Sequence, residues 1–128
     1  MNEVEKMYSN AGIKPVIRDN AIGKGYYIEH QRVEEYPPFT AEKQLEIMKA
    51  ISTNHISADY SYKYLGIDRD EIDGEIYLNL CIDGEKYHAH DKDFSVALAK
   101  LVNLIWRDLT DAERTQIKEI LEWITLRK

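Results

Sequence analysis

The feature that most constrains the fold is a pair of extended segments joined by Asp83-Gly84. Apolar and polar residues alternate over residues 75–82, and residues 85–90 return with a matching pattern. Asp-Gly is typical of a two-residue hairpin turn, because both positions require a positive φ. Such a turn sets the register of the strands, and the register must keep one face apolar. The expected facing pairs are Ile82 with Glu85, Leu80 with Tyr87, and Leu78 with Ala89.

Helical patterns account for much of the remaining chain, at residues 2–10, 41–52, 94–107 and from 110 onwards. Asn2, Thr40 and Asp93 are suitable N-caps for the first three helices, and residues 110–113 form a capping box for the last. The helix at 94–107 is apolar around much of its circumference. This predicts that it lies between two layers or in an interface.

Helical spacing also predicts which side chains of the shorter helices are buried. In the helix at 41–52, the expected buried stripe consists of Leu45, Ile47, Met48 and Ile51. In the last helix, residues at i, i+3, i+4 and i+7 form one apolar face, namely Ile117, Ile120, Leu121 and Ile124.

The segment between the first two helices is expected to be mostly extended. Residues 15–18 form a short strand, residues 19–20 a turn and residues 23–25 a flexible joint. Residues 26–30 form a second strand, rich in aromatic and apolar side chains. Residues 36–39 contain two prolines and form a stiff connector to the helix that follows.

Residues 58–65 alternate, which places Tyr60, Tyr62 and Tyr64 on one face of a strand. Residues 66–74 then form an acidic loop. A row of tyrosines can stack nucleic-acid bases, but this stretch has few interleaved cations. Core packing or a protein interface suits the tyrosines better, because tyrosine combines a large rigid ring with a polar tip.

Consecutive strands joined by tight turns predict an antiparallel sheet with the 75–90 hairpin at its centre and helices over its apolar face. The expected class is α+β. The 128 residues, of which 44% are hydrophobic and 31% charged, fit one soluble domain spanning 1–128. The single cysteine, Cys81, excludes an internal disulfide framework. With no apolar run near ~18 residues and no secretory signal, we expect a cytoplasmic protein without a membrane partner.

The net charge of −6 is concentrated in the middle third of the chain, most densely at Asp68, Asp70, Glu71, Asp73 and Glu75. A nucleic-acid binder needs a basic stripe that neutralises phosphates, so direct binding of DNA or RNA is not expected. An acidic patch can instead meet a basic protein surface and steer association with it. The competing interpretation is a solvated loop that aids solubility.

Two histidines, His88 and His90, alternate on the second hairpin strand and share its polar face. Two histidines at i and i+2 can reach one metal ion, with Cys81 as a third ligand. The competing interpretation is the polar outer face of a half-buried sheet.

Other chemical motifs are missing or incomplete. Residues 68–74 resemble a calcium-binding loop, but Ile72 occupies a ligand position and Asp73 the glycine position. No phosphate-binding loop or nucleophile elbow is present in the sequence. The sequence therefore predicts no catalytic residue and no cofactor. We expect a protein that is not an enzyme.

Three segments resemble small proteins carried by phages and prophages of Gram-positive bacteria: residues 3–13, 36–46 and 76–105. The last, a hairpin followed by an Ala/Leu-rich helix, is similar to small phage domains described as an α-β-α sandwich. In those domains a proline-aromatic-Ser/Thr cap precedes the first helix, as Pro38-Phe39-Thr40 does here. An Asp often follows that cap, where this chain has Ala41-Glu42. The resemblance implies a mobile-element origin and action in the cytoplasm of a bacterial host, and it transfers no functional residue.

These observations lead to three functional hypotheses. The first is a phage accessory protein that binds a host or phage protein, and in particular antagonises a host defence or regulatory protein that handles nucleic acid. Its partner-binding residues would be the five clustered acids and the three alternating tyrosines. The second is a structural or packaging accessory that self-associates as a homodimer or a larger ring through the helix at 94–107 and Trp123. The third is a metal-dependent enzyme that uses His88 and His90.

Overall fold

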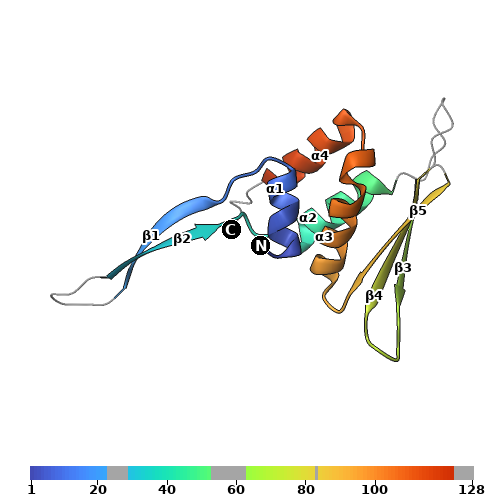
Figure 1. The fold of residues 1–128 in the computed structure, drawn as a ribbon, viewed down its shortest axis with the longest axis horizontal. Coiled ribbons are helices and arrows are strands. Elements are labelled where there is room, and N and C mark those ends of the chain that lie inside the picture. The colour runs from blue at the N-terminus through green and yellow to red at the C-terminus, as the bar shows by residue number, and fades with distance from the viewer. Residues whose placement is uncertain (23–28, 53–62, 83, 123–128) are drawn as a thin grey trace.

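The computed structural model describes residues 1–22, 29–52, 63–82 and 84–122 (Figure 1). The chain has the expected α+β class. In chain order its elements are α1 (Glu3–Asn10), β1 (Val16–Ile22), β2 (Glu29–Glu35), α2 (Ala41–Ile51), β3 (Lys63–Arg69), β4 (Ile76–Ile82), β5 (Glu85–Asp91), α3 (Phe94–Ile105), the 3₁₀ helix η1 (Trp106–Asp108) and α4 (Asp111–Glu122).

Strands β3, β4 and β5 form an antiparallel sheet in that order, with β4 in the centre. The predicted register of the β4–β5 hairpin is confirmed, since Ile82 faces Glu85, Leu80 faces Tyr87 and Leu78 faces Ala89. Gly84 has a φ of 92°, as the turn requires of its second residue.

Helix α3 lies between the sheet and α1 (Figure 1). On one side it packs against β5 and β4, where Leu78, Leu80 and Ala89 are buried. On the other side it packs against α1. The apolar residues around this helix therefore pack against other elements of the same chain, and the prediction of a helix between two layers is confirmed. The helix ends at Ile105, two residues earlier than expected, and continues as η1.

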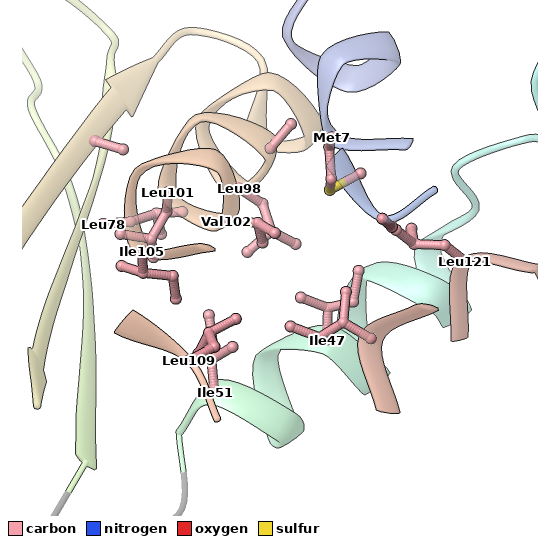
Figure 2. Close-up of a cluster of buried hydrophobic side chains, with 14 of the residues drawn as sticks. Met7, Ile47, Ile51, Leu78, Leu98, Leu101, Val102, Ile105, Leu109 and Leu121 are labelled. Atoms are coloured by element: carbon pink, nitrogen blue, oxygen red, sulfur yellow. The ribbon is translucent and has the colours of Figure 1, made fainter. Parts of the chain in front are cut away.

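The buried side chains of the helices and the sheet form one cluster (Figure 2). Helix α2 packs on α4 and contributes Ile47 and Ile51 to this cluster. The prediction that Leu45 is buried is wrong, because its side chain is 49% exposed. The buried face of α2 runs instead through Lys43, Ile47, Ala50 and Ile51, and residue 45 lies on the opposite side of that helix.

The predicted helix caps are confirmed. Asn2 and Glu5 exchange reciprocal hydrogen bonds at the start of α1. The Thr40 hydroxyl accepts from the backbone N–H of Lys43, and Asp93 caps α3 through Ser95. Thr110 and Glu113 form the expected capping box of α4. Each cap satisfies backbone donors that the first helical turn leaves free.

Strands β1 and β2 form a separate two-stranded antiparallel ribbon, which projects from the helices (Figure 1). The predicted turn at 19–20 is wrong, because Asp19 and Asn20 lie within β1 opposite Arg32 and Gln31. The second strand begins at Glu29 and continues to Glu35, beyond the predicted end at residue 30. Cross-strand pairing has overridden the turn preference of Asp and Asn. The joint expected at 23–25 lies outside the described residues.

The acidic loop predicted at 66–74 is shorter than expected. Residues 66–69 belong to β3, where Asp68 pairs with Tyr77, and only residues 70–75 connect the two strands. Glycine and acidic residues are poor strand formers, but pairing with the apolar β4 holds them extended. Of the predicted tyrosine row, Tyr64 pairs with Cys81 in the sheet, and Tyr60 and Tyr62 lie outside the described residues.

Candidate functional site

Residues 70–75 connect β3 and β4, and two backbone hydrogen bonds within this segment close the turn. The N–H of Asp70 donates to the carbonyl of Glu75 at 2.9 Å, and the N–H of Gly74 donates to the carbonyl of Asp70 at 2.8 Å. Gly74 has a φ of 73°, a conformation that costs glycine little. We call this six-residue segment the acidic turn.

Two carboxylates hold the acidic turn in shape. Oδ1 of Asp70 accepts from the N–H of Ile72 at 2.7 Å and from that of Asp73 at 3.4 Å. Oδ1 of Asp73 accepts from the N–H of Glu75 at 2.8 Å. Side-chain acceptors of this kind stabilise turns in place of a backbone partner. Asp70 and Asp73 are therefore part of the scaffold of the turn, and the predicted site residues differ in role.

The side chain of Ile72 is 97% exposed within this turn. Glu71 beside it and Asp68 on β3 are also exposed. A single exposed apolar side chain is common on protein surfaces. Here the side chain stands on a turn that five internal hydrogen bonds hold in place, with carboxylates around it. The acidic turn thus presents one aliphatic group in a fixed, negatively charged setting.

Glu75, at the end of the acidic turn, contacts the neighbouring strand. Its Oε1 lies 2.6 Å from Nδ1 of His90, and this ring stacks on Tyr77 with 5.0 Å between ring centroids. The Tyr77 hydroxyl donates to Oδ2 of Asp73 at 3.2 Å. Burial and the hydrogen bond to Asp73 raise the pKa of the Tyr77 hydroxyl. These contacts fasten the acidic turn to the body of the sheet.

The two histidines have different partners. Nδ1 of His88 lies 2.5 Å from Oδ1 of Asn79, and Nδ1 of His90 contacts Glu75. Cys81 faces Lys86 across the hairpin. Within the described ranges, no group of three or more His, Cys, Asp or Glu side chains is placed to hold a metal ion. The metal-site hypothesis for His88 and His90 gains no third ligand from these ranges.

Lys43 was not predicted to be buried, yet its side chain is 1% exposed among apolar residues. Its Nζ donates to the carbonyl of Leu121 at 2.9 Å and lies 5.8 Å from the centre of the Tyr8 ring. Burial lowers the pKa of the Lys43 amine. The signal in the sequence was its position one helical turn before Ile47. We assign this lysine to the support of α4 rather than to the site.

A cleft of about 400 Å³ between α1 and α3 was also missed. Its lining includes three cations, Lys6, Lys100 and Arg107. Because Lys6 is far from Lys100 and Arg107 in the sequence, no cluster of basic residues marks the three. The molecule therefore carries an acidic and a basic surface feature on different elements.

Comparisons with protein-family models, curated proteins and solved structures found no match for this chain. The resemblance to phage proteins therefore stays a prediction. Among the described residues, no helix combines the length and the apolar content that a membrane span requires.

Proposed function

We propose that this chain is a non-enzymatic, protein-binding accessory of phage or prophage origin, which acts in the bacterial cytoplasm through the acidic turn. The proposal rests on the exposure of Ile72, whose side chain is 97% exposed on a turn that its own hydrogen bonds stabilise. A partner that fits this turn has an apolar pocket surrounded by basic residues.

The rigidity of the acidic turn supports binding. A segment that is ordered before it binds loses little conformational entropy on association. Apolar anchors that fill a partner's pocket dominate the energy of many interfaces. Carboxylates around the anchor accelerate the encounter with a basic surface and set its orientation. Ile72 would supply affinity, and Glu71 and Asp68 would supply steering.

The most specific form of the proposal is antagonism of a host protein that handles nucleic acid. Such a protein carries a basic surface that binds phosphates. Carboxylates of the acidic turn would occupy positions where phosphates otherwise lie, and the chain would compete with the nucleic acid for that surface.

The test is a pull-down from host lysate, read by mass spectrometry. The turn variant carries Asp68→Asn, Glu71→Gln and Ile72→Ser, and leaves Asp70 and Asp73 in place because they brace the turn. A matched control carries Glu46→Gln, Glu119→Gln and Leu45→Ser, which remove two exposed acids and one half-exposed leucine elsewhere. We expect wild type and the control to capture the same nucleic-acid-handling protein, and the turn variant to lose it.

With the purified partner, loss of an anchor residue worth about 2 kcal/mol corresponds to about 30-fold weaker binding. Added nucleic acid should displace the wild-type chain. Equal capture by wild type and the turn variant would contradict the proposal, as would capture of the chain itself and phage components alone.

A further inference from the structure

Hydrogen bonds of Asn103 connect α1 and α3 at the cleft. Nδ2 of Asn103 donates to the backbone carbonyl of Glu3 at 3.0 Å and to its Oε1 at 3.1 Å. Oδ1 of Asn103 accepts from Nδ2 of Asn10 at 2.9 Å. These hydrogen bonds join α1 to α3 at the cleft, whose lining includes both Glu3 and Asn103.

The lining of the cleft carries three cations, one carboxylate, that of Glu3, and one apolar side chain. Lys100 is held by Oδ2 of Asp91 and the carbonyl of His90, each at 3.1 Å. Lys6 and Arg107 are exposed, and no ion pair joins them to another residue in the described part of the chain. Leu104, 50% exposed, adds an aliphatic surface. In a chain with a net charge of −6, this cleft is a local site of positive charge.

The cleft and the acidic turn are complementary in charge, and each has one exposed aliphatic side chain. The turn offers one exposed aliphatic side chain with carboxylates around it. The cleft offers one exposed aliphatic side chain beside three cations and the Glu3 carboxylate, which accepts a hydrogen bond from Asn103. No residue of the turn lines the cleft of its own chain. Figure 1 shows the turn at the free end of the β3–β4 hairpin, beyond the helices.

We propose that this cleft binds the acidic turn of a second copy of the chain. Ile72 of one copy packs on Leu104 of the other, and Glu71 faces Lys6 and Arg107. A single contact of this kind leaves one cleft free on one copy and one turn free on the other, so further copies can add head-to-tail and generate a ring or an open chain of subunits. The contact is small and charged, so the association is weak and salt-sensitive.

The inference goes beyond the proposed function, since the cleft has no part in host binding. It also adds a form of regulation, because a host protein and a second copy would compete for the same turn. Self-association would keep the turn covered at high concentration and release it on dilution.

The first test is sedimentation velocity of the full chain over a wide range of concentrations. We expect the average mass to rise with concentration at low ionic strength. Raising the ionic strength from ~0.01 to ~1 M shortens the screening length from ~30 to ~3 Å, and should weaken the association by at least about tenfold. A wild-type chain that stays monomeric at every concentration at low salt would overturn the proposal.

Two variants isolate the two surfaces. The turn variant for this test carries Glu71→Lys with Ile72→Ser, and the cleft variant carries Lys6→Glu with Arg107→Glu. All four side chains are exposed, so we expect both variants to keep the circular dichroism spectrum of the wild type. Each variant alone should remain monomeric. A control with Lys14→Glu and Lys118→Glu, which makes the same change in net charge as the cleft variant, should associate like the wild type.

A mixture of the turn variant and the cleft variant tests the contact most directly. The intact turn of the cleft variant can enter the intact cleft of the turn variant, so an equimolar mixture should contain a species of two chains. Combining Glu71→Lys with Lys6→Glu and Arg107→Glu in one chain should restore part of the self-association. If the mixture contains only monomers while the wild type associates, the head-to-tail contact is wrong.

The failure of this inference is distinguishable from failure of the proposed function. The cleft variant should still capture the host protein in the pull-down, since its turn is unchanged. A mixture that forms the two-chain species supports the inference even if no host protein is captured.

Discussion

The β1–β2 ribbon and the β3–β4–β5 sheet are both built from antiparallel strands of seven residues. The sheet is covered by α3, which helps to bury Leu78, Leu80 and Ala89. The ribbon projects from the helices (Figure 1), and its main contacts are those between its own two strands. Strand length and antiparallel pairing are alike, so the two regions differ in the number of strands, two against three, and in what covers them.

This difference shows where the stability of the molecule resides. A two-stranded hairpin alone is marginally stable in water, and a sheet needs an apolar face packed on another layer. We therefore expect the sheet and α3 to unfold together with the whole molecule, and the ribbon to open locally at lower cost. The acidic turn belongs to the stable region, because it connects two strands of the covered sheet.

The largest effect should come from truncating a residue between the sheet and α3. Leu78→Ala should lower the free energy of unfolding by about 2–5 kcal/mol, because it removes buried apolar contacts and leaves a cavity. Val16→Ala in the ribbon, where the valine is 53% exposed, should cost less than about 0.5 kcal/mol. Urea denaturation of both variants measures the difference. Equal losses would show that the ribbon is as tightly integrated as the sheet.

A smaller effect is expected at the start of α3. Oδ1 of Asp93 accepts from the N–H and the hydroxyl of Ser95, at 2.8 and 2.6 Å. Asp93→Ala should cost about 1 kcal/mol at neutral pH, whereas Asp93→Asn retains an acceptor and should cost less. Urea denaturation of the two variants compares the cap with the covered face. An alanine variant as stable as the wild type would contradict a role for the cap in holding α3.

The stability that Asp93 contributes depends on pH because of the same contacts. The hydrogen bonds from Ser95 lower the pKa of the Asp93 carboxyl in the folded state. Its contribution is therefore present above the pKa of the unfolded chain and is lost as the pH falls through the lower folded value. The gap in stability between wild type and Asp93→Ala should shrink below about pH 4.

The smallest effect concerns the edge of the sheet. The Tyr87 hydroxyl on β5 donates to Oδ2 of Asp108 in η1 at 2.7 Å. This hydrogen bond, together with burial, raises the pKa of Tyr87 to about 12. Its contribution is present below the unfolded pKa near 10 and is lost as the pH rises through the folded value.

Tyr87→Phe should therefore be slightly less stable than the wild type up to about pH 10, and the gap should close as the pH approaches 12. Denaturation at several alkaline pH values measures the gap, and the ultraviolet absorbance of the phenolate reports the titration. A gap that widens above pH 10 would contradict the assigned hydrogen bond.

The hairpin register and the helix caps could be derived from the sequence because both depend on residues close together in the chain. Asp83-Gly84 sets the turn, and the apolar alternation of β4 excludes any register shifted by one residue. The ribbon could not be derived in the same way. Asp19 and Asn20 favour turns by themselves, and only pairing with β2 holds them extended.

The candidate site was predictable in part. The acids of the turn were recognised from their density, but their roles were not. Which carboxylates accept backbone hydrogen bonds, and the contact between Glu75 and His90, depend on the path of the backbone and on strand pairing. The exposure of Ile72 depends on the same path, because an isoleucine is more often buried.

The sequence by itself determined the α+β class, the positions of the helix caps and the register of one hairpin, because periodicity, capping and turn chemistry act over a few residues. Only the tertiary structure decided which face of α2 is buried, which carboxylates brace the acidic turn, and where basic residues meet. Lys6 and Arg107 lie at opposite ends of the chain and line one cleft because α1 packs on α3. Packing between distant elements has no local signal in the sequence, and this packing builds the basic cleft.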